Sequence, residues 1–139
     1  MHENPASEEI RSLLSGARTV AVVGLSDRPY STSHAIPRAL QGFGFRIFPV
    51  NPNLSGPVLG EEPYSRVREI PEGVDIVDVF RRGETVFPVA EDAVAAGARA
   101  LWMQSGVVNE EAAAYASEHG LTVIMDRCIK VDYALLVGG

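Results

Sequence analysis

Unbroken apolar runs alternate with helical patterns along the chain. The clearest run covers residues 20–23, and four consecutive apolar side chains there predict a strand buried on both faces. Gly24 follows directly, small and polar residues come next, and a helical spacing begins near Ser33. A buried strand, a glycine turn and a helix N-terminus in this order are typical of the first unit of a nucleotide-binding α/β domain. Such a turn directs backbone N–H groups and the positive end of a helix toward a phosphate.

The same alternation continues to the end of the chain. Apolar runs predict strands, and apolar residues three and four positions apart predict helices. The expected strands cover residues 19–24, 45–50, 74–80, 100–103 and 121–125, and the expected helices cover residues 7–14, 33–43, 84–96, 110–119 and 131–136. Ser7 and Asn109 are the expected N-caps, and Gly97 and Gly120 are expected to end their helices. Between the second and third strands, residues 57–60 suggest a short extended piece and residues 65–70 a short helix.

Strands that alternate regularly with helices favour a parallel sheet with helices on both faces. We therefore expect an α/β fold, a Rossmann-like doubly wound sheet that is mostly parallel and has about five main strands. The 139 residues suit a single domain spanning residues 1–139. Ligands of such sheets bind beyond the carboxyl ends of the strands, so the residues just after each strand are the candidates for a functional site.

Most of those residues are small, polar or charged. They are Gly24, Leu25, Ser26 and Asp27; Asn51 and Pro52; Phe80, Arg81 and Arg82; Gln104, Ser105 and Gly106; and Asp126, Arg127 and Cys128. Hydroxyls, amides and arginines suit anionic oxygens, and Arg28, Arg81 and Arg82 are candidates for charge-assisted hydrogen bonds to phosphate. Arginines in loops are often simply solvated, but the position of Arg81 and Arg82 directly after a strand favours a binding role.

The glycine turn departs from the dinucleotide fingerprint. That fingerprint has three glycines and an acidic residue about 20 positions further on, which holds the ribose. Here Ser26 and Pro29 stand near Gly24, and Asn51 rather than an acid ends the second strand. An NAD(H)-sensing module is therefore an alternative with weaker support, and the chain also lacks a DNA-binding helix pair.

Charge and composition narrow the partners and the compartment. The formal net charge of −6 argues against nucleic-acid binding, which needs a basic face. No apolar run approaches the roughly 20 residues of a membrane span, and the polar start does not resemble a signal peptide. A single cysteine excludes an intrachain disulfide, and together these features lead us to expect a cytoplasmic protein.

Candidate catalytic groups are sparse. His2 lies in the polar start, His34 lies near the predicted phosphate loop, and His119 lies at a helix end. No spacing typical of metal ligands is present, so no metal site and no catalytic site are expected. Cys128 has the basic neighbours Arg127 and Lys130, which can make a thiol reactive, but a half-buried small side chain is the favoured interpretation. A binding protein is expected rather than an enzyme, with thiol or acyl-transfer chemistry at Cys128 as the alternative.

Five short motifs follow one another in an order typical of one family. They are VAVVGLSDRP at 20–29, PVNP at 49–52, DIVDVFRR at 75–82, LWMQSG at 101–106 and MDRC at 125–128. With these motifs the chain resembles the small stand-alone CoA-binding proteins of the YccU-like group. That group shares the Rossmann-like CoA-binding domain of the succinyl-CoA synthetase alpha subunit. The resemblance extends over residues 14–133.

The resemblance implies that the ligand is coenzyme A or an acyl-CoA. The implied cofactor-binding residues are Gly24, Ser26, Asp27 and Arg28 at the pyrophosphate, Asn51 and Pro52 beside the ribose phosphate, Val79, Phe80 and Arg81 around the adenine, and Gln104 and Gly106 along the pantetheine. The synthetases also need a phosphorylated histidine on a second domain and an ATP-grasp partner. No residue here matches that histidine, so the resemblance implies a non-catalytic protein that acts as a CoA-responsive adaptor or regulator. A pure interaction domain with a vestigial pocket is a further alternative.

Overall fold

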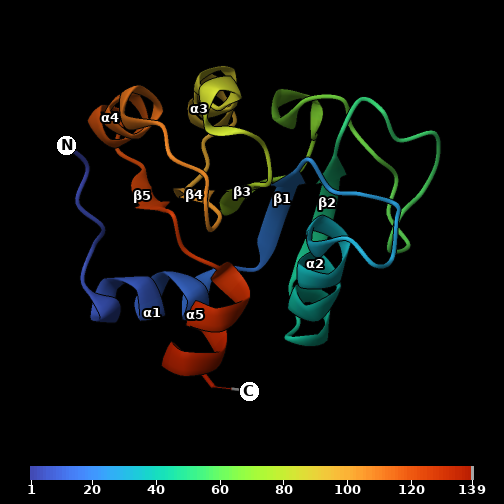
Figure 1. Ribbon diagram of the computed structural model, residues 1–139, viewed down its shortest axis with the longest axis horizontal. Helices are drawn as coiled ribbons and strands as arrows, with labels where there is room; N and C mark the ends of the chain where they lie inside the picture. Colours follow the sequence, from blue (N-terminus) through green and yellow to red (C-terminus); the bar gives the residue numbers. More distant parts are fainter. Residues whose placement is uncertain (139) are drawn as a thin grey trace.

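Five parallel strands form one sheet in the order β2-β1-β3-β4-β5 (Figure 1). They are β1 (Thr19–Val23), β2 (Arg46–Val50), β3 (Ile76–Val79), β4 (Ala100–Met103) and β5 (Thr122–Met125). The computed structural model describes residues 1–138. In β1, Val23 pairs with Val50 of β2 on one side and with Val79 of β3 on the other. The expected parallel α/β fold is confirmed.

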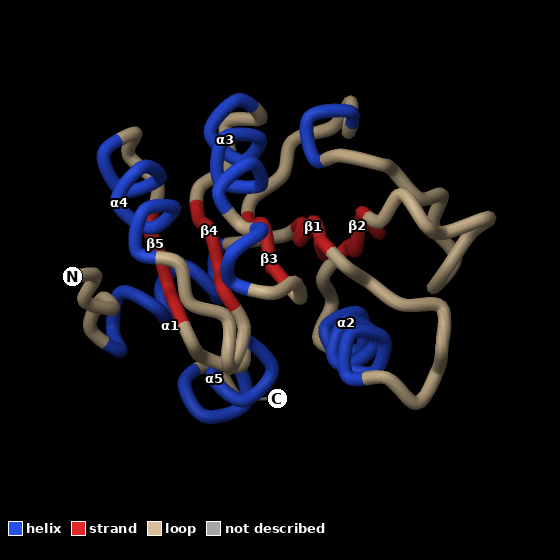
Figure 2. Tube along the Cα trace, turned by 45° about the horizontal axis from the view of Figure 1, so that its top comes forward, coloured by secondary structure: helices blue, strands red, loops and turns tan. Residues whose placement is uncertain are grey.

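Helices cover both faces of the sheet. They are α1 (Ser7–Gly16), α2 (Thr32–Gly42), α3 (Phe87–Ala95), α4 (Glu110–Glu118) and α5 (Ile129–Leu136), with single 3₁₀ turns η1 (Val67–Glu69) and η2 (Gly83–Thr85). The helices α3 and α4 lie on one face, and α1, α2 and α5 lie on the other (Figures 1 and 2). None of the described helices has both the length and the apolar character that crossing a membrane requires.

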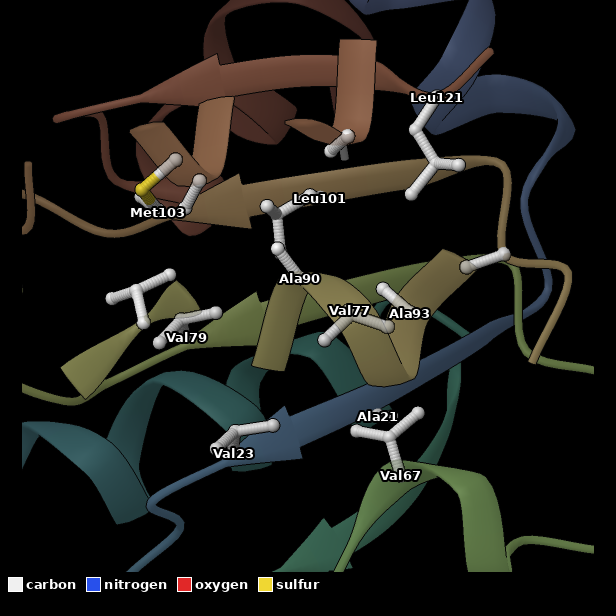
Figure 3. Close-up of a cluster of buried hydrophobic side chains, with 14 of the residues drawn as sticks. Ala21, Val23, Val67, Val77, Val79, Ala90, Ala93, Leu101, Met103 and Leu121 are labelled. Atoms are coloured by element: carbon white, nitrogen blue, oxygen red, sulfur yellow. The ribbon is translucent and has the colours of Figure 1, made fainter. Parts of the chain in front are cut away.

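Alternate residues of each strand enter two separate hydrophobic layers. Figure 3 shows the layer beneath α3, where Val23, Val79 and Met103 point away from the sheet on the same side. Val22 and Trp102 belong to the layer beneath α1, α2 and α5. Because both faces of the central strands are buried, both sets of positions are apolar apart from Asp78 in β3, which accounts for the apolar runs in the sequence.

Two expectations about helix starts are wrong. Ser7 does not cap α1, because the N-cap is Ala6 and Ser7 is the first helical residue. The expected helix 84–96 is divided into the 3₁₀ turn η2 and the shorter helix α3. The 3₁₀ turn begins at Gly83, where a Cβ would lie 2.2 Å from the carbonyl oxygen of Val108, and Pro88 lacks the N–H that one continuous helix would donate to the Glu84 carbonyl. Pro88 then occupies the first turn of α3, where its missing N–H has no intrahelical partner to lose.

The expected cap of α4 and the expected glycines at the ends of α3 and α4 are confirmed. The Asn109 side chain accepts a hydrogen bond from the Ala112 N–H at 2.9 Å and so caps α4. Gly97 and Gly120 follow α3 and α4 with φ of +71° and +90°, a region that glycine enters without strain. The expected extended piece at 57–60 is present only as an isolated antiparallel bridge between Val58 and Glu61.

Candidate functional site

The chain changes its winding direction between β1 and β3. The helix α2 connects β1 to β2 on one face of the sheet, whereas α3 connects β3 to β4 on the opposite face (Figure 1). In open parallel sheets a crevice forms at such a point, beyond the carboxyl ends of the two strands. Gly24 follows β1 there, and Phe80 and Arg81 follow β3.

Gly24 is held between the ends of the neighbouring strands. Its N–H donates to the Val50 carbonyl at 2.8 Å, and the Phe80 N–H donates to the Val23 carbonyl at 2.8 Å. The φ of Gly24 is +90°, and a Cβ placed on it would lie 2.5 Å from the carbonyl oxygen of Phe80. Only glycine fits this turn, and its closeness to Phe80 brings the loop after β1 against the loop after β3.

Side chains of the loop after β1 hold its shape. The Asn51 Nδ2 donates to the Leu25 carbonyl at 3.0 Å, and the Ser26 Oγ accepts the Arg28 N–H at 3.0 Å. The His34 Nδ1 lies 2.7 Å from the Ser26 carbonyl, so this ring nitrogen carries the proton. Asn51 and Ser26 therefore position the loop that leads to the N-terminus of α2.

Two cavities open at this edge, and Arg81 lines both of them. The first, which we call the α3-side cavity, has a volume of about 500 Å³ and includes Arg66, Glu84 and Thr85 in its lining. The second, the α5-side cavity, has a volume of about 620 Å³. Its lining includes Ser33, Phe80, Arg82, Gln104, Gly106 and Cys128. Both volumes lie in the range of small-molecule sites.

Free positive charge gathers at the same edge. Within residues 1–138, Arg28, Arg81 and Arg82 form no ion pair. Arg81 is half-buried between the two cavities, and the other two side chains are exposed. An arginine without a carboxylate partner keeps all its donors available for a phosphate, which it binds with charge-assisted hydrogen bonds.

Asp92 fixes one wall of the α3-side cavity. Its carboxylate is 5% exposed and accepts hydrogen bonds at 2.7 Å from both Arg66 and Arg68, on either side of the start of η1. Burial by itself raises the pKa of Asp92, but the hydrogen bonds and charges of the two arginines outweigh it and hold the pKa below its ordinary value of 3.8. The connection between β2 and β3 is thereby tied to α3.

Asp92→Asn is expected to lower the free energy of unfolding by about 1–2 kcal/mol at neutral pH, because it weakens two charge-assisted hydrogen bonds. The folded-state pKa is depressed, so this stability is present above pH 3.8 and is lost as the pH falls through the folded-state pKa. Urea unfolding at pH 7 and pH 2 measures both effects. Glu118→Gln, at an exposed position that forms no ion pair within residues 1–138, is the control and should change neither value.

The residues expected from the sequence fall into three groups. Phe80, Arg81, Gln104 and Gly106 line the cavities. Gly24, Ser26, Asp27, Arg28, Asn51 and Pro52 lie in the adjoining loops outside the two linings. The side chain of Val79 is fully buried in the layer beneath α3, so only its backbone reaches the edge, where its carbonyl accepts the Gln104 N–H at 3.3 Å.

Several lining residues were not expected. Arg66 comes from the irregular connection between β2 and β3. The sequence shows no regular spacing of apolar residues there, so it gave no reason to expect a site residue. Thr32 and Ser33 belong to the first turn of α2, so the helix start in the sequence was a usable signal for them. No group of three or more His, Cys, Asp or Glu side chains in the described part of the chain is arranged to hold a metal ion.

Comparisons of the sequence with known proteins point to one family. The model of a family described as "CoA binding domain" matches residues 18–134. The uncharacterized protein YneT of Bacillus subtilis (strain 168) is 47% identical over 133 residues, which are 96% of this chain and 98% of that protein. The match therefore extends over essentially the whole of both chains.

Solved structures of other proteins share this fold over nearly the whole chain. A hypothetical protein from Pyrococcus horikoshii OT3 is 31% identical, with a TM-score of 0.92 over 99% of this chain and 100% of that chain. A Thermus thermophilus protein, cell-free ID.343, is 34% identical, with a TM-score of 0.90 over 95% of this chain and 99% of that chain. A dinucleotide-forming acetyl-coenzyme A synthetase from Ca. Korarchaeum cryptofilum shares the fold over 78% of this chain and 25% of its own, with 24% identity and a TM-score of 0.67. The family match over residues 18–134, together with these relatives, shows that the chain belongs to the CoA-binding domain family.

Proposed function

We propose that this protein binds coenzyme A or an acyl-CoA at the carboxyl edge of the sheet and does not act on it as an enzyme. The observation that carries the proposal is the position of Arg81. This half-buried arginine, which has no ion-pair partner among residues 1–138, lines two cavities at once and lies beside the Gly24 turn. A ligand with a diphosphate at its centre and a bulky group at each end matches that arrangement.

Coenzyme A has this chemical layout, with a phosphorylated nucleoside at one end and pantetheine at the other. In the proposed complex the diphosphate lies by Arg81 and the first turn of α2, where backbone N–H groups and the helix dipole favour an anion. Each cavity then receives one end of the ligand. Membership of the CoA-binding domain family supports this choice of ligand.

The side chains around the cavities support a binding role without catalysis. The α5-side cavity is lined within residues 1–138 by arginines, hydroxyls, one amide, the Cys128 thiol and apolar groups, without a carboxylate or imidazole to act as a general base. In the α3-side cavity, Asp92 is engaged by Arg66 and Arg68, and the other carboxylate, that of Glu84, is exposed. A protein that binds CoA reversibly is suited to report its concentration to another component, and we propose a regulatory role of this kind.

Arg81→Ala is expected to weaken CoA binding by about 10- to 100-fold, because the variant loses charge-assisted hydrogen bonds to phosphate. Calorimetric titration of the purified protein with CoA, acetyl-CoA, NAD⁺ and NADH makes the measurement. Arg99→Ala is the matched control, since Arg99 is exposed at the opposite edge of the sheet, directly before β4, and its loss changes the net charge equally. Binding of NADH without binding of CoA would contradict the proposal.

A further inference from the structure

The α5-side cavity contains a thiol and a buried amide. Cys128 is the single cysteine of the chain, is half-buried, and directly precedes α5. Gln104 follows β4 and is 4% exposed. Both side chains line the cavity. A glutamine buried to this degree needs hydrogen-bond partners for its oxygen and for its nitrogen. If one of these partners is missing in the protein, a ligand group can supply it.

The amide of Gln104 has a fixed orientation. Its Oε1 accepts the Ile129 N–H at 3.0 Å, so the Nε2 group is the end that faces away from α5. Among the described residues, Nε2 has no hydrogen-bond partner. It is not sealed from solvent either, because the only unpartnered side-chain polar atoms that are sealed there are the two carboxylate oxygens of Asp78. Nε2 is therefore the part of Gln104 that reaches the cavity, and its N–H donors are free for a ligand carbonyl.

The loops that carry these two residues are joined by hydrogen bonds. The Asp126 carboxylate accepts the Gly106 N–H at 2.7 Å, and the Trp102 indole N–H donates to the Arg127 carbonyl at 2.8 Å. The bond from Ile129 to Gln104 adds a third connection, at the residue next to Cys128. The thiol and the amide donor are thereby held in a fixed relation before any ligand arrives.

We propose that this cavity captures the thiol end of its ligand covalently, as a mixed disulfide with Cys128. The inference rests on the proposed function, because it takes the pantetheine end of CoA as the occupant. Pantetheine ends in an amide carbonyl, an N–H, two methylene groups and a sulfur. Gln104 donates to that carbonyl, and the short segment beyond it brings the ligand sulfur to Cys128.

The reaction is thiol–disulfide exchange with the disulfide form of the ligand. The Cys128 sulfur attacks one sulfur of CoA disulfide, a new sulfur–sulfur bond forms, and the original one breaks. One CoA leaves as the thiol and takes up the proton that Cys128 loses, so Cys128 is oxidised and the departing sulfur is reduced. With no second cysteine in the chain, only an external thiol reverses the step. The fraction of Cys128 that carries CoA then follows the ratio of CoA disulfide to thiols.

Three symmetric disulfides test the inference on the unaltered protein. CoA disulfide carries the nucleotide and the amide carbonyl, pantethine carries the carbonyl alone, and cystamine carries neither. Intact-mass spectrometry follows adduct formation on the reduced protein, and each rate is divided by the rate of the same disulfide with N-acetylcysteine. The normalised rate is expected to fall about tenfold from CoA disulfide to pantethine and again from pantethine to cystamine. Cys128→Ser identifies the modified residue and should give no adduct.

Gln104→Met removes the amide donor at nearly constant volume, and with it the acceptor of the Ile129 N–H. It is expected to abolish the preference for pantethine over cystamine while leaving the preference for CoA disulfide over pantethine. Equal normalised rates for all three disulfides would overturn the inference, and calorimetry of reduced CoA under reducing conditions would then show separately whether the proposed function stands. A preference for pantethine over cystamine without reversible binding of reduced CoA would support the thiol-capture cavity and overturn the proposed CoA site.

Discussion

Replacing Gly24 with alanine is expected to lower the free energy of unfolding by about 2–4 kcal/mol and to remove ligand binding at the carboxyl edge. Two costs combine at this position. A φ of +90° is strained for any residue with a Cβ, and that Cβ would lie 2.5 Å from the Phe80 carbonyl oxygen. The second cost involves backbone on both sides, so no side-chain rotation relieves it. The strand ends must separate, and Arg81 moves with them.

Gly120→Ala is the matched control for this prediction. Gly120 has the same φ of +90°, but a Cβ placed on it would meet nothing within 4 Å, so it bears the conformational cost alone, about 1–2 kcal/mol. Urea unfolding of the two variants isolates the contact between Gly24 and Phe80 as the difference. Equal losses of stability would show that the backbone at Phe80 yields to the extra atom. CoA titration of each variant then reports the effect on the site.

Asp78→Asn is expected to flatten the pH dependence of stability on the side above pH 3.8. Asp78 lies in the middle strand of the sheet between Val22 and Trp102, fully buried, and neither carboxylate oxygen has a partner among the described residues. Burial therefore raises the pKa of Asp78 well above its ordinary value of 3.8. Keeping the carboxyl neutral is less costly than burying an unpaired charge.

The sign of the effect follows from proton binding. The folded state holds the Asp78 proton more tightly than the unfolded state, so the contribution of Asp78 to stability is greatest below pH 3.8 and falls as the pH rises toward the folded-state pKa. The fall approaches about 1.4 kcal/mol for each pH unit in that window. Asn keeps the size of the side chain and cannot ionise, so the variant should gain stability over the natural protein as the pH rises.

Urea unfolding from pH 3 to pH 9 makes this measurement. Glu62→Gln, at an exposed loop position, is the control and should keep the pH dependence of the natural protein. Asp78 changes the stability above pH 3.8, whereas the contribution of Asp92 is lost below pH 3.8. The effects of the two carboxylates therefore appear in different pH ranges. A variant whose stability stays parallel to that of the natural protein would mean that Asp78 is charged and paired in solution.

The position of the candidate site was predictable from the sequence, but the contacts of each residue in it were not. Parallel strands end at one edge, so the residues after them had to gather there, and Arg81 and Gln104 do line cavities. Asn51 and Ser26 follow the same rule, yet their side chains bind the loop itself. Whether a polar side chain faces a ligand or its own backbone depends on where other segments lie, and a local pattern does not contain that information.

The sequence by itself determined the strands, the parallel sheet and the edge at which the candidate site lies, because burial on both faces demands the apolar runs that mark each strand. Only the tertiary structure decided the rest. Gly83 lies against the Val108 carbonyl, where no side chain fits, and the cavity wall depends on Arg66 reaching Asp92. The free donor of Gln104 depends on Ile129 occupying its oxygen. Each of these is a contact between residues far apart in the chain, where side-chain identity alone carries no signal of the partner.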